Sequence, residues 1–183
     1  MKTRIFILVE GEDDVRFFGR IIKPLLIKRY DAVEIIPYAS IKRTKVDNFL
    51  KSIRMMNNDY IFVADIDCEQ SVRDKKQVLY SHFSHIDGGS IMVVIKEIES
   101  WYYAGLSPES VLDLDVPALS LTDDLTKEDF NRLIPRKYDS RIDFMFEILK
   151  YFSIDTARKK NHSFRFFVER YHLEDPAGEH AYQ

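Results

Sequence analysis

The sequence is poor in cysteine. Cys68 is the single cysteine among 183 residues, which excludes an internal disulfide. The five histidines do not show the spacing of zinc ligands, so any bound metal ion is expected to be held by oxygen atoms. No apolar stretch reaches the roughly 20 residues that a membrane-spanning helix requires, and Met1 to Arg4 do not form a signal peptide. These absences predict a soluble, cytoplasmic protein without membrane contact.

Positive charge is not in excess either, because 27 Lys and Arg residues are balanced by 30 Asp and Glu residues. This balance argues against a protein that coats nucleic acid. The distribution is uneven: residues 1–60 carry 12 basic and 8 acidic side chains, whereas residues 61–135 carry 6 and 14. Basic segments around an acidic site would suit a phosphate backbone that crosses bound metal ions, although solvated surface charges would give the same composition. The candidate nucleic-acid contacts are Lys42, Arg43, Lys45, Lys159, Lys160 and Arg165.

Three apolar runs, at residues 5–9, 60–64 and 91–95, each end at acidic residues. Runs of this length that are rich in Val, Ile and Phe are typical of strands buried on both faces of a parallel sheet. Parallel strands present their carboxyl ends at one edge, where α/β proteins keep their sites. We therefore expect a cluster of carboxylates at that edge, which would attract a hard divalent cation such as Mg²⁺. The acidic residues that follow the runs are Glu10, Asp65 with Asp67, and Glu97 with Glu99.

Helical periodicity between these runs, with a further strand at residues 33–38, gives the order βαβαβαβ. This order predicts an α/β fold with a mostly parallel four-stranded sheet and helices on both faces. Pro24 is expected to kink or split the first helix. Pro37 is expected to place the end of its strand near a sheet edge or exit.

Beyond Trp101 the strand signal ends. Thr126 with Asp129 resembles a capping box, and Ser163 is expected to cap the last helix. We expect one extended domain over residues 1–183, with an α/β core at 1–106, a helical extension at 107–175 and a tail at 176–183. The aromatic residues at 101–103 could stack on bases, but aromatic residues after a buried strand more often form core. The apolar helical stripes are Ile142, Met145, Phe146, Leu149 and Phe152, then Phe164, Phe167, Val168 and Tyr171.

Asp65 and Asp67 carry the most specific chemical signal. They stand two apart in an expected extended segment, so both side chains should leave the same face and could share a metal ion. Packing alone would not favour them, because unpaired buried carboxylates are costly. Glu10 and Gly11 place another carboxylate at a strand end, and Asp14 lies one helical turn further on, where it could also cap the helix.

The segment 9–14, followed by residues 64–67, resembles the TOPRIM domain, in which a strand-terminal Glu-Gly and a later strand-terminal Asp-x-Asp recur. The resemblance implies a TOPRIM-like, Rossmann-like sheet, Glu10 as metal ligand or general acid/base, and Asp65 and Asp67 as Mg²⁺ ligands. Residues 99–104 and 163–167 are similar to segments of small TOPRIM-like proteins related to the OLD-family nucleases. The glycine that commonly follows Asp-x-Asp in primases and topoisomerases is absent; Cys68 and Glu69 stand there.

These signals together predict a stand-alone nuclease that depends on Mg²⁺ or Mn²⁺ and acts on DNA or RNA. Lys96 could neutralise charge developing on the phosphate, or form a salt bridge with Asp65 or Glu97. The expected catalytic residues are Glu10, Asp14, Asp65, Asp67 and Lys96. The expected metal ligands are Glu10, Asp65, Asp67 and Glu99, with Glu69 and Glu97 as secondary candidates.

Two other functions compete with the nuclease. Acidic residues after the first strand, Asp65 after a central strand and Lys96 after a later one could form a receiver-like phospho-acceptor that binds a single Mg²⁺. Asp67 and the long helical region fit that class poorly. A TOPRIM-like module that binds a partner, such as a nuclease-system ATPase, without strong activity of its own is the third hypothesis.

Overall fold

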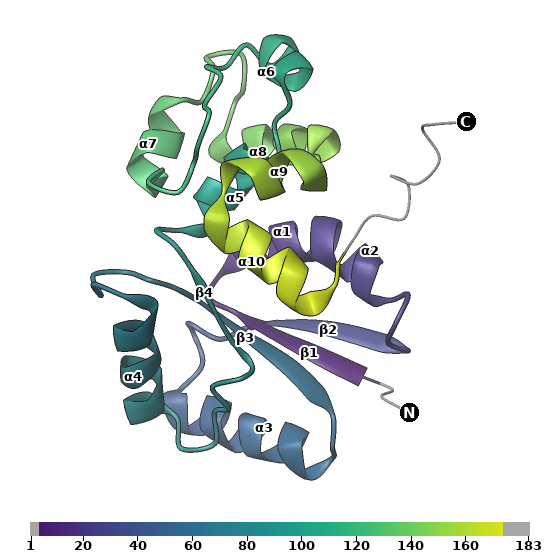
Figure 1. Cartoon of the computed structure of the whole chain (residues 1–183), viewed down its shortest axis with the longest axis vertical. Coiled ribbons are helices and arrows are strands. Elements are labelled where there is room, and N and C mark those ends of the chain that lie inside the picture. Colours follow the sequence, from purple (N-terminus) through teal and green to yellow (C-terminus); the bar gives the residue numbers. More distant parts are fainter. Residues whose placement is uncertain (1–3, 174–183) are drawn as a thin grey trace. The chain divides into compact units, whose positions relative to one another are not determined.

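The protein is an α/β protein built on a four-stranded, all-parallel sheet (Figure 1). The computed structural model describes residues 4–173. The strand order is β2-β1-β3-β4, which confirms the expected fold class. Pro37 is the last residue of an edge strand, as its lack of an N–H donor requires. The strands are β1 (Arg4–Val9), β2 (Ala32–Pro37), β3 (Asp59–Asp65) and β4 (Ile91–Val94).

The crossover helices follow the expected order. The first is divided into α1 (Glu12–Phe17), a π-helical segment η1 (Phe18–Ile22) and α2 (Lys23–Leu26). Pro24 stands in the first turn of α2, where its missing N–H costs least, so the expected split occurs just before it. The next crossovers contain α3 (Arg43–Met55) and α4 (Val72–His82).

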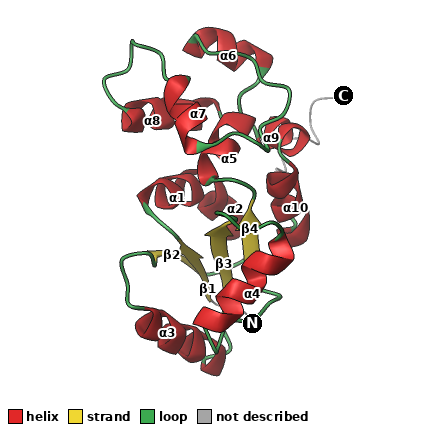
Figure 2. Cartoon of the chain, turned by 90° about the vertical axis from the view of Figure 1, so that its left-hand side faces the viewer, coloured by secondary structure: helices red, strands yellow, loops and turns green. Residues whose placement is uncertain are grey.

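Apolar residues cover both faces of the sheet. Alternate β1 and β3 side chains, including Phe6, Leu8 and Phe62, pack with Leu50 of α3 and Leu79 of α4 in one buried cluster. The segments α1 and α2 lie on the opposite side of the sheet from α3 and α4 (Figures 1 and 2). The sheet therefore lies between two helical layers.

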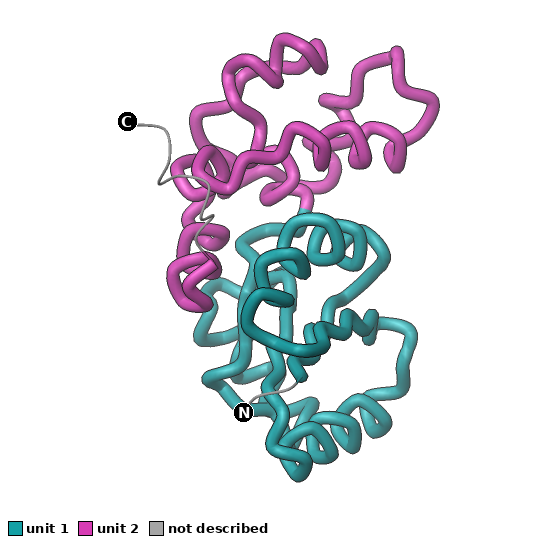
Figure 3. Tube along the Cα trace, turned by 90° about the vertical axis from the view of Figure 1, so that its right-hand side faces the viewer, with its two compact units in different colours: residues 1–98 teal, residues 99–183 magenta. Residues whose placement is uncertain are grey.

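The chain divides into two compact units after Ile98 (Figure 3). The division falls before residue 106, where the sequence placed the end of the α/β core, and the expected tail at 176–183 lies outside the described residues. Within residues 4–173 no helix is long and apolar enough to cross a membrane. The helices after β4 are α5 (Ile98–Ala104), α6 (Pro108–Leu114), α7 (Lys127–Arg132), α8 (Arg141–Tyr151), α9 (Ile154–Lys160) and α10 (His162–Tyr171).

The second unit has an aromatic core. Trp101, Tyr102 and Tyr103 are fully buried, as the bulk of such residues favours. Trp101 packs edge-on against Phe164 with ring centroids 5.1 Å apart. The expected burial of the α10 stripe is correct for Phe164, Phe167 and Val168.

The expected apolar stripe of α8 is correct for Met145 and Leu149 and wrong for Ile142 and Phe146. Ile142 and Phe146 are 44% and 50% exposed, and the buried face consists of Phe144, Met145, Ile148 and Leu149. Both sets follow helical spacing because six of the eleven residues are apolar. Periodicity alone therefore could not choose between two stripes that overlap.

The two expected helix caps have different outcomes. Thr126 and Asp129 form the predicted capping box at α7. Ser163 is not the cap of α10: the side chain of Asn161 accepts from the Phe164 N–H at 2.9 Å, and Ser163 accepts from Trp101 Nε1 at 2.8 Å. Asn is as good an N-cap as Ser, so local preference did not decide the position.

Two Gly→Ala substitutions should change stability in opposite directions. A Cβ on Gly105 would overlap the ring of Phe152, so Gly105→Ala should lower the free energy of unfolding by roughly 1–3 kcal/mol through overpacking. Gly19 is helical and its Cβ would meet Ile35 at an ordinary 3.8 Å, so Gly19→Ala should add roughly 0.5–1 kcal/mol. Urea unfolding of both variants measures the difference, and equal effects would contradict it.

Candidate functional site

The carboxyl ends of β1 and β3 bring acidic residues together. These neighbouring strands are parallel, so Glu10, which follows β1, and Asp65, which ends β3, lie at the same edge of the sheet. The Asp65 N–H donates to Glu10 Oε1 at 3.0 Å. The predicted placement of these two residues at one edge of the sheet is confirmed.

A pocket of about 450 Å³ opens beside this pair, between the edge of the sheet and the helices α3 and α4. We call it the carboxylate pocket. Apolar residues such as Val46, Leu79 and Phe83 form part of its wall. Its polar and ionisable lining residues are Glu10, Tyr38, Arg43, Asp67, Cys68, Glu69, Lys75 and His82.

Burial is the largest influence on the charge of Glu10, and it raises the pKa of this carboxyl group above the ordinary value of 4.5. The hydrogen bond from the Asp65 N–H opposes the shift, the negative charge of Asp67 adds to it, and the ammonium of Lys75 opposes it. The net shift is upward. Glu10 is thus a carboxylate that becomes more stable when it gains a proton or a nearby cation.

Tyr38 lies next to Glu10 in the carboxylate pocket. Its hydroxyl donates to the Val63 carbonyl oxygen at 2.9 Å, and Glu10 Oε1 is 3.4 Å away. Burial raises the pKa of Tyr38 well above its ordinary value of 10.0, and the charges of Glu10, Asp14 and Asp65 raise it further. The phenol therefore stays protonated at neutral pH, where its hydroxyl donates one hydrogen bond and its oxygen can still accept another.

Asp14 has the expected capping role at the start of α1, and its catalytic role stays a prediction. It is buried in the first turn of α1, and its Oδ2 accepts from the Gly11 N–H at 3.2 Å. It therefore holds the turn that follows β1 and contributes negative charge to the cluster.

The expectation that Asp65 and Asp67 share one face of an extended segment is wrong. The strand ends at Asp65, and Asp67 has a left-handed backbone with φ of 53°. Aspartate tolerates this conformation better than most residues do. Asp67 forms an ion pair with Lys75 of α4, whose side chain is only 7% exposed, whereas that of Asp67 is 57% exposed.

Lys96 shares the left-handed conformation of Asp67. It follows β4 with φ of 61°, a backbone that costs roughly 1–3 kcal/mol for an ordinary residue. Two adjacent strands of the sheet therefore lead into non-glycine residues with positive φ. Such conformations concentrate at functional sites.

Glu99 belongs to the second compact unit. It begins the second unit, where it is buried and forms an ion pair with Arg141 of α8. Of the secondary candidates, Glu69 lines the carboxylate pocket, and Glu97 is half-buried between β4 and α5.

The basic candidates fall into two groups. Lys42, Arg43 and Lys45 are exposed at the start of α3, and Arg43 lines the carboxylate pocket. In the second unit Lys159 and Arg165 are exposed, whereas Lys160 is half-buried and donates to the Leu106 carbonyl oxygen at 2.6 Å. Burial lowers the pKa of Lys160. Lys160 thus already serves the packing of its own unit.

Sequence reasoning missed Lys75 and Tyr38. Lys75 lies four residues before Leu79 on the buried face of α4, so a lysine at an apolar position of the helical pattern was the available signal. Tyr38 gave no such signal, because a tyrosine after an apolar strand is ordinary.

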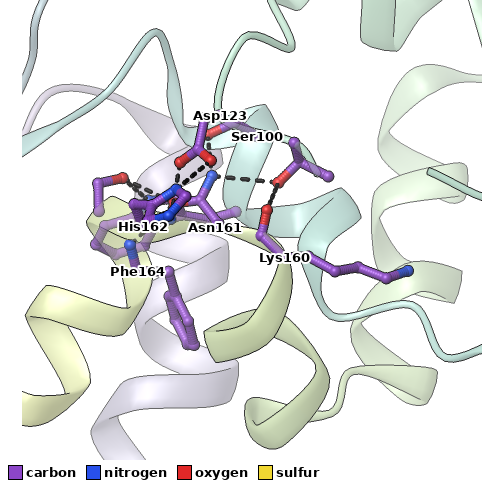
Figure 4. A network of polar contacts seen from close by, with 9 residues as sticks. Ser100, Asp123, Lys160, Asn161, His162 and Phe164 are labelled. Atoms are coloured by element: carbon purple, nitrogen blue, oxygen red, sulfur yellow. Dashed lines mark hydrogen bonds and ion pairs between the residues drawn. The ribbon is translucent and has the colours of Figure 1, made fainter. Parts of the chain in front are cut away.

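The second unit contains a polar network around Asn161 that the sequence did not reveal (Figure 4). The buried amide of Asn161 donates to Ser100 and Thr122 and accepts from the Ser163 hydroxyl. Beside it, His162 donates its backbone N–H to Asp123 at 2.7 Å, and its ring nitrogen lies 2.6 Å from the same carboxylate. Such satisfied networks fix core packing.

The donor chemistry of the carboxylate pocket suits a hard cation, because Glu10 and Asp67 offer oxygen atoms and repel each other. In the described part of the chain, no three His, Cys, Asp or Glu side chains are already arranged to hold a metal ion. Comparison of the sequence and structure with protein-family models, curated proteins and solved structures gives no match.

The raised pKa of Glu10 predicts a specific pH dependence. The folded chain binds more protons at Glu10 than the unfolded chain, so stability falls as the pH rises above 4.5 through the raised value. Glu10→Gln removes this loss while keeping an oxygen for the Asp65 N–H. The variant should therefore be more stable than the wild type at neutral pH, with a difference that shrinks on acidification.

Thermal unfolding in EDTA across the acidic and neutral range tests this prediction. Glu12→Gln is the control, because Glu12 is exposed and the α1 dipole favours its charge. A Glu10→Gln variant that is less stable than the wild type at neutral pH would contradict the prediction.

Proposed function

We propose that the protein is a nuclease that depends on Mg²⁺ or Mn²⁺ and cleaves phosphodiester bonds at the carboxylate pocket. The observation that supports this most directly is that Glu10 and Asp67, from the ends of two different strands, line one pocket with Lys75 and Arg43. Carboxylates and cations in one pocket suit a substrate that is itself a phosphate anion and a cofactor that is a cation. The resemblance of residues 9–14 and 64–67 to the TOPRIM domain also supports a metal-dependent nuclease.

The basic start of α3 supports a nucleic-acid substrate. Its first turn has no acidic residue and contains Arg43 and Lys45. Positive side chains there are unfavourable, because the helix dipole is also positive at its N-terminus. The same arrangement favours a bound phosphate, which accepts from the free N–H groups and pairs with the side chains.

The proposal assigns a role to each group at the carboxyl edge. Glu10 and Asp67 would hold the metal ion, with Asp65 beside them, and the ion would lower the pKa of a bound water and polarise the phosphate. Glu99 is not among the residues that line the carboxylate pocket, so this proposal does not use it for the metal. Lys96 remains a candidate for charge stabilisation, and a partner ATPase could deliver the substrate.

Glu10→Gln or Asp67→Asn should lower turnover of DNA or RNA by a factor of about 100 or more, because each removes a charge that stabilises the transition state. The assay uses single- and double-stranded substrates with Mg²⁺ or Mn²⁺. If the wild type and Glu10→Gln cleave every substrate equally, the activity does not come from this pocket. A stable phosphoryl group on Asp65 from a small phosphodonor would instead support the receiver-like hypothesis.

Arg43→Ala should weaken nucleic-acid binding and reduce the slope of log K against log salt by about 0.7–0.9, the contribution of one phosphate contact. It should not lower the melting temperature, because it removes a charge that the α3 dipole disfavours. Lys51→Ala is the matched control, since Lys51 is an exposed cation of the same helix. Fluorescence anisotropy over a salt series measures both variants. Equal slopes for both would exclude Arg43 as a phosphate contact.

A further inference from the structure

Lys75 is a buried positive charge in the carboxylate pocket. Its side chain is 7% exposed, and burial of an ammonium group is costly unless an anion accompanies it. Its ion-pair partner is Asp67, and its charge also acts favourably on Glu10. The ammonium therefore offsets part of the repulsion between two carboxylates, Asp67 and Glu10.

We propose that Lys75 is the resident counter-cation of the carboxylate pocket and competes with a divalent metal ion for Asp67. This inference rests on the proposed metal site and adds the means by which the site is balanced when no metal is bound. A carboxylate that accepts from an ammonium group has fewer lone pairs directed at a metal ion. A second cation in the same pocket is also repelled by the first.

Two features of the Lys75–Asp67 pair would allow a metal ion to replace the ammonium at Asp67. Asp67 is more than half exposed, so its carboxylate can turn toward the pocket or solvent at small cost, and Glu10 remains in the pocket as a second anion for the ammonium. Lys75 is anchored by α4 but has a long flexible stem, so its ammonium can leave Asp67 and remain in the pocket. The released ammonium would then be available to bind a phosphate oxygen of the substrate.

The test is Mn²⁺ binding to Lys75→Met, measured from the electron paramagnetic resonance signal of the free ion. If Lys75 competes with the metal, the variant should bind Mn²⁺ at least about tenfold more tightly than the wild type, the effect of one partly screened charge. Arg73→Met is the matched control, because Arg73 is an exposed cation of the same helix and the substitution changes net charge equally. It should bind Mn²⁺ as the wild type does.

A double variant separates competition from a general electrostatic effect. In an Asp67→Asn background, Lys75→Met should change Mn²⁺ affinity much less, because the contested carboxylate is gone. Unchanged or weaker Mn²⁺ binding by folded Lys75→Met would overturn the proposal, as would the same gain with and without Asp67.

The wild type offers a measurement that needs no variant to fold. Acylation of Lys75 by an amine-reactive ester, followed by mass spectrometry, should become faster when Mn²⁺ releases the ammonium from Asp67, and a rate that Mn²⁺ leaves unchanged would overturn the proposal. The Mn²⁺ binding and acylation experiments do not depend on cleavage of a nucleic acid. Tighter Mn²⁺ binding by Lys75→Met with no nuclease activity would refute the proposed function alone, whereas active wild type with no Lys75 effect would refute this inference alone.

Discussion

The repulsion between carboxylates at one edge of a parallel sheet is the constraint around which the first unit is organised. Parallel strands deliver Glu10 and Asp65 to the same edge whatever their charge, because strand direction is fixed by the crossover helices. Other groups of the fold then have to offset the repulsion between these carboxylates. The Asp65 N–H donates to Glu10, and Lys75 pairs with Asp67. Each compensating group comes from a different part of the chain, so the edge is stable only when the sheet and α4 have assembled together.

The strands and their order were predictable because the signals are local and strong. Continuous apolar runs, helical periodicity between them and the position of Pro37 determine a parallel sheet with little competition from other folds. The apolar face of α8 was not predictable, since its sequence contains two stripes with helical spacing and only the surrounding core selects one. The cap of α10 was missed for a related reason. Asn161 and Ser163 are both good caps, and the need of Trp101 for an acceptor decides their roles.

The candidate site was predictable in its composition and not in its geometry. Strand ends identify Glu10, Asp65 and Asp67, because an acidic residue after a buried run has few structural uses. The left-handed turn at Asp67 could not be inferred, since aspartate is compatible with both extended and left-handed backbone. Lys75 is distant in sequence from Glu10, and only the packing of α4 against the sheet reveals that they share a pocket.

Local energetics distinguish the two polar centres of the molecule. In the second unit, the Asn161 side chain satisfies several buried polar groups at once, an arrangement that fixes local packing. At the carboxyl edge the local choices are unfavourable: a raised pKa at Glu10, left-handed backbone at Asp67 and Lys96, and basic residues at the start of α3. A bound cation would stabilise the Glu10 carboxylate, and a bound phosphate would offset the basic residues at the start of α3. The left-handed backbone at Asp67 and Lys96 is a separate local cost of a kind that functional sites often carry. Departures from local consistency gather at functional sites, which is why the carboxylate pocket rather than the Asn161 network is the centre of function proposed for this protein.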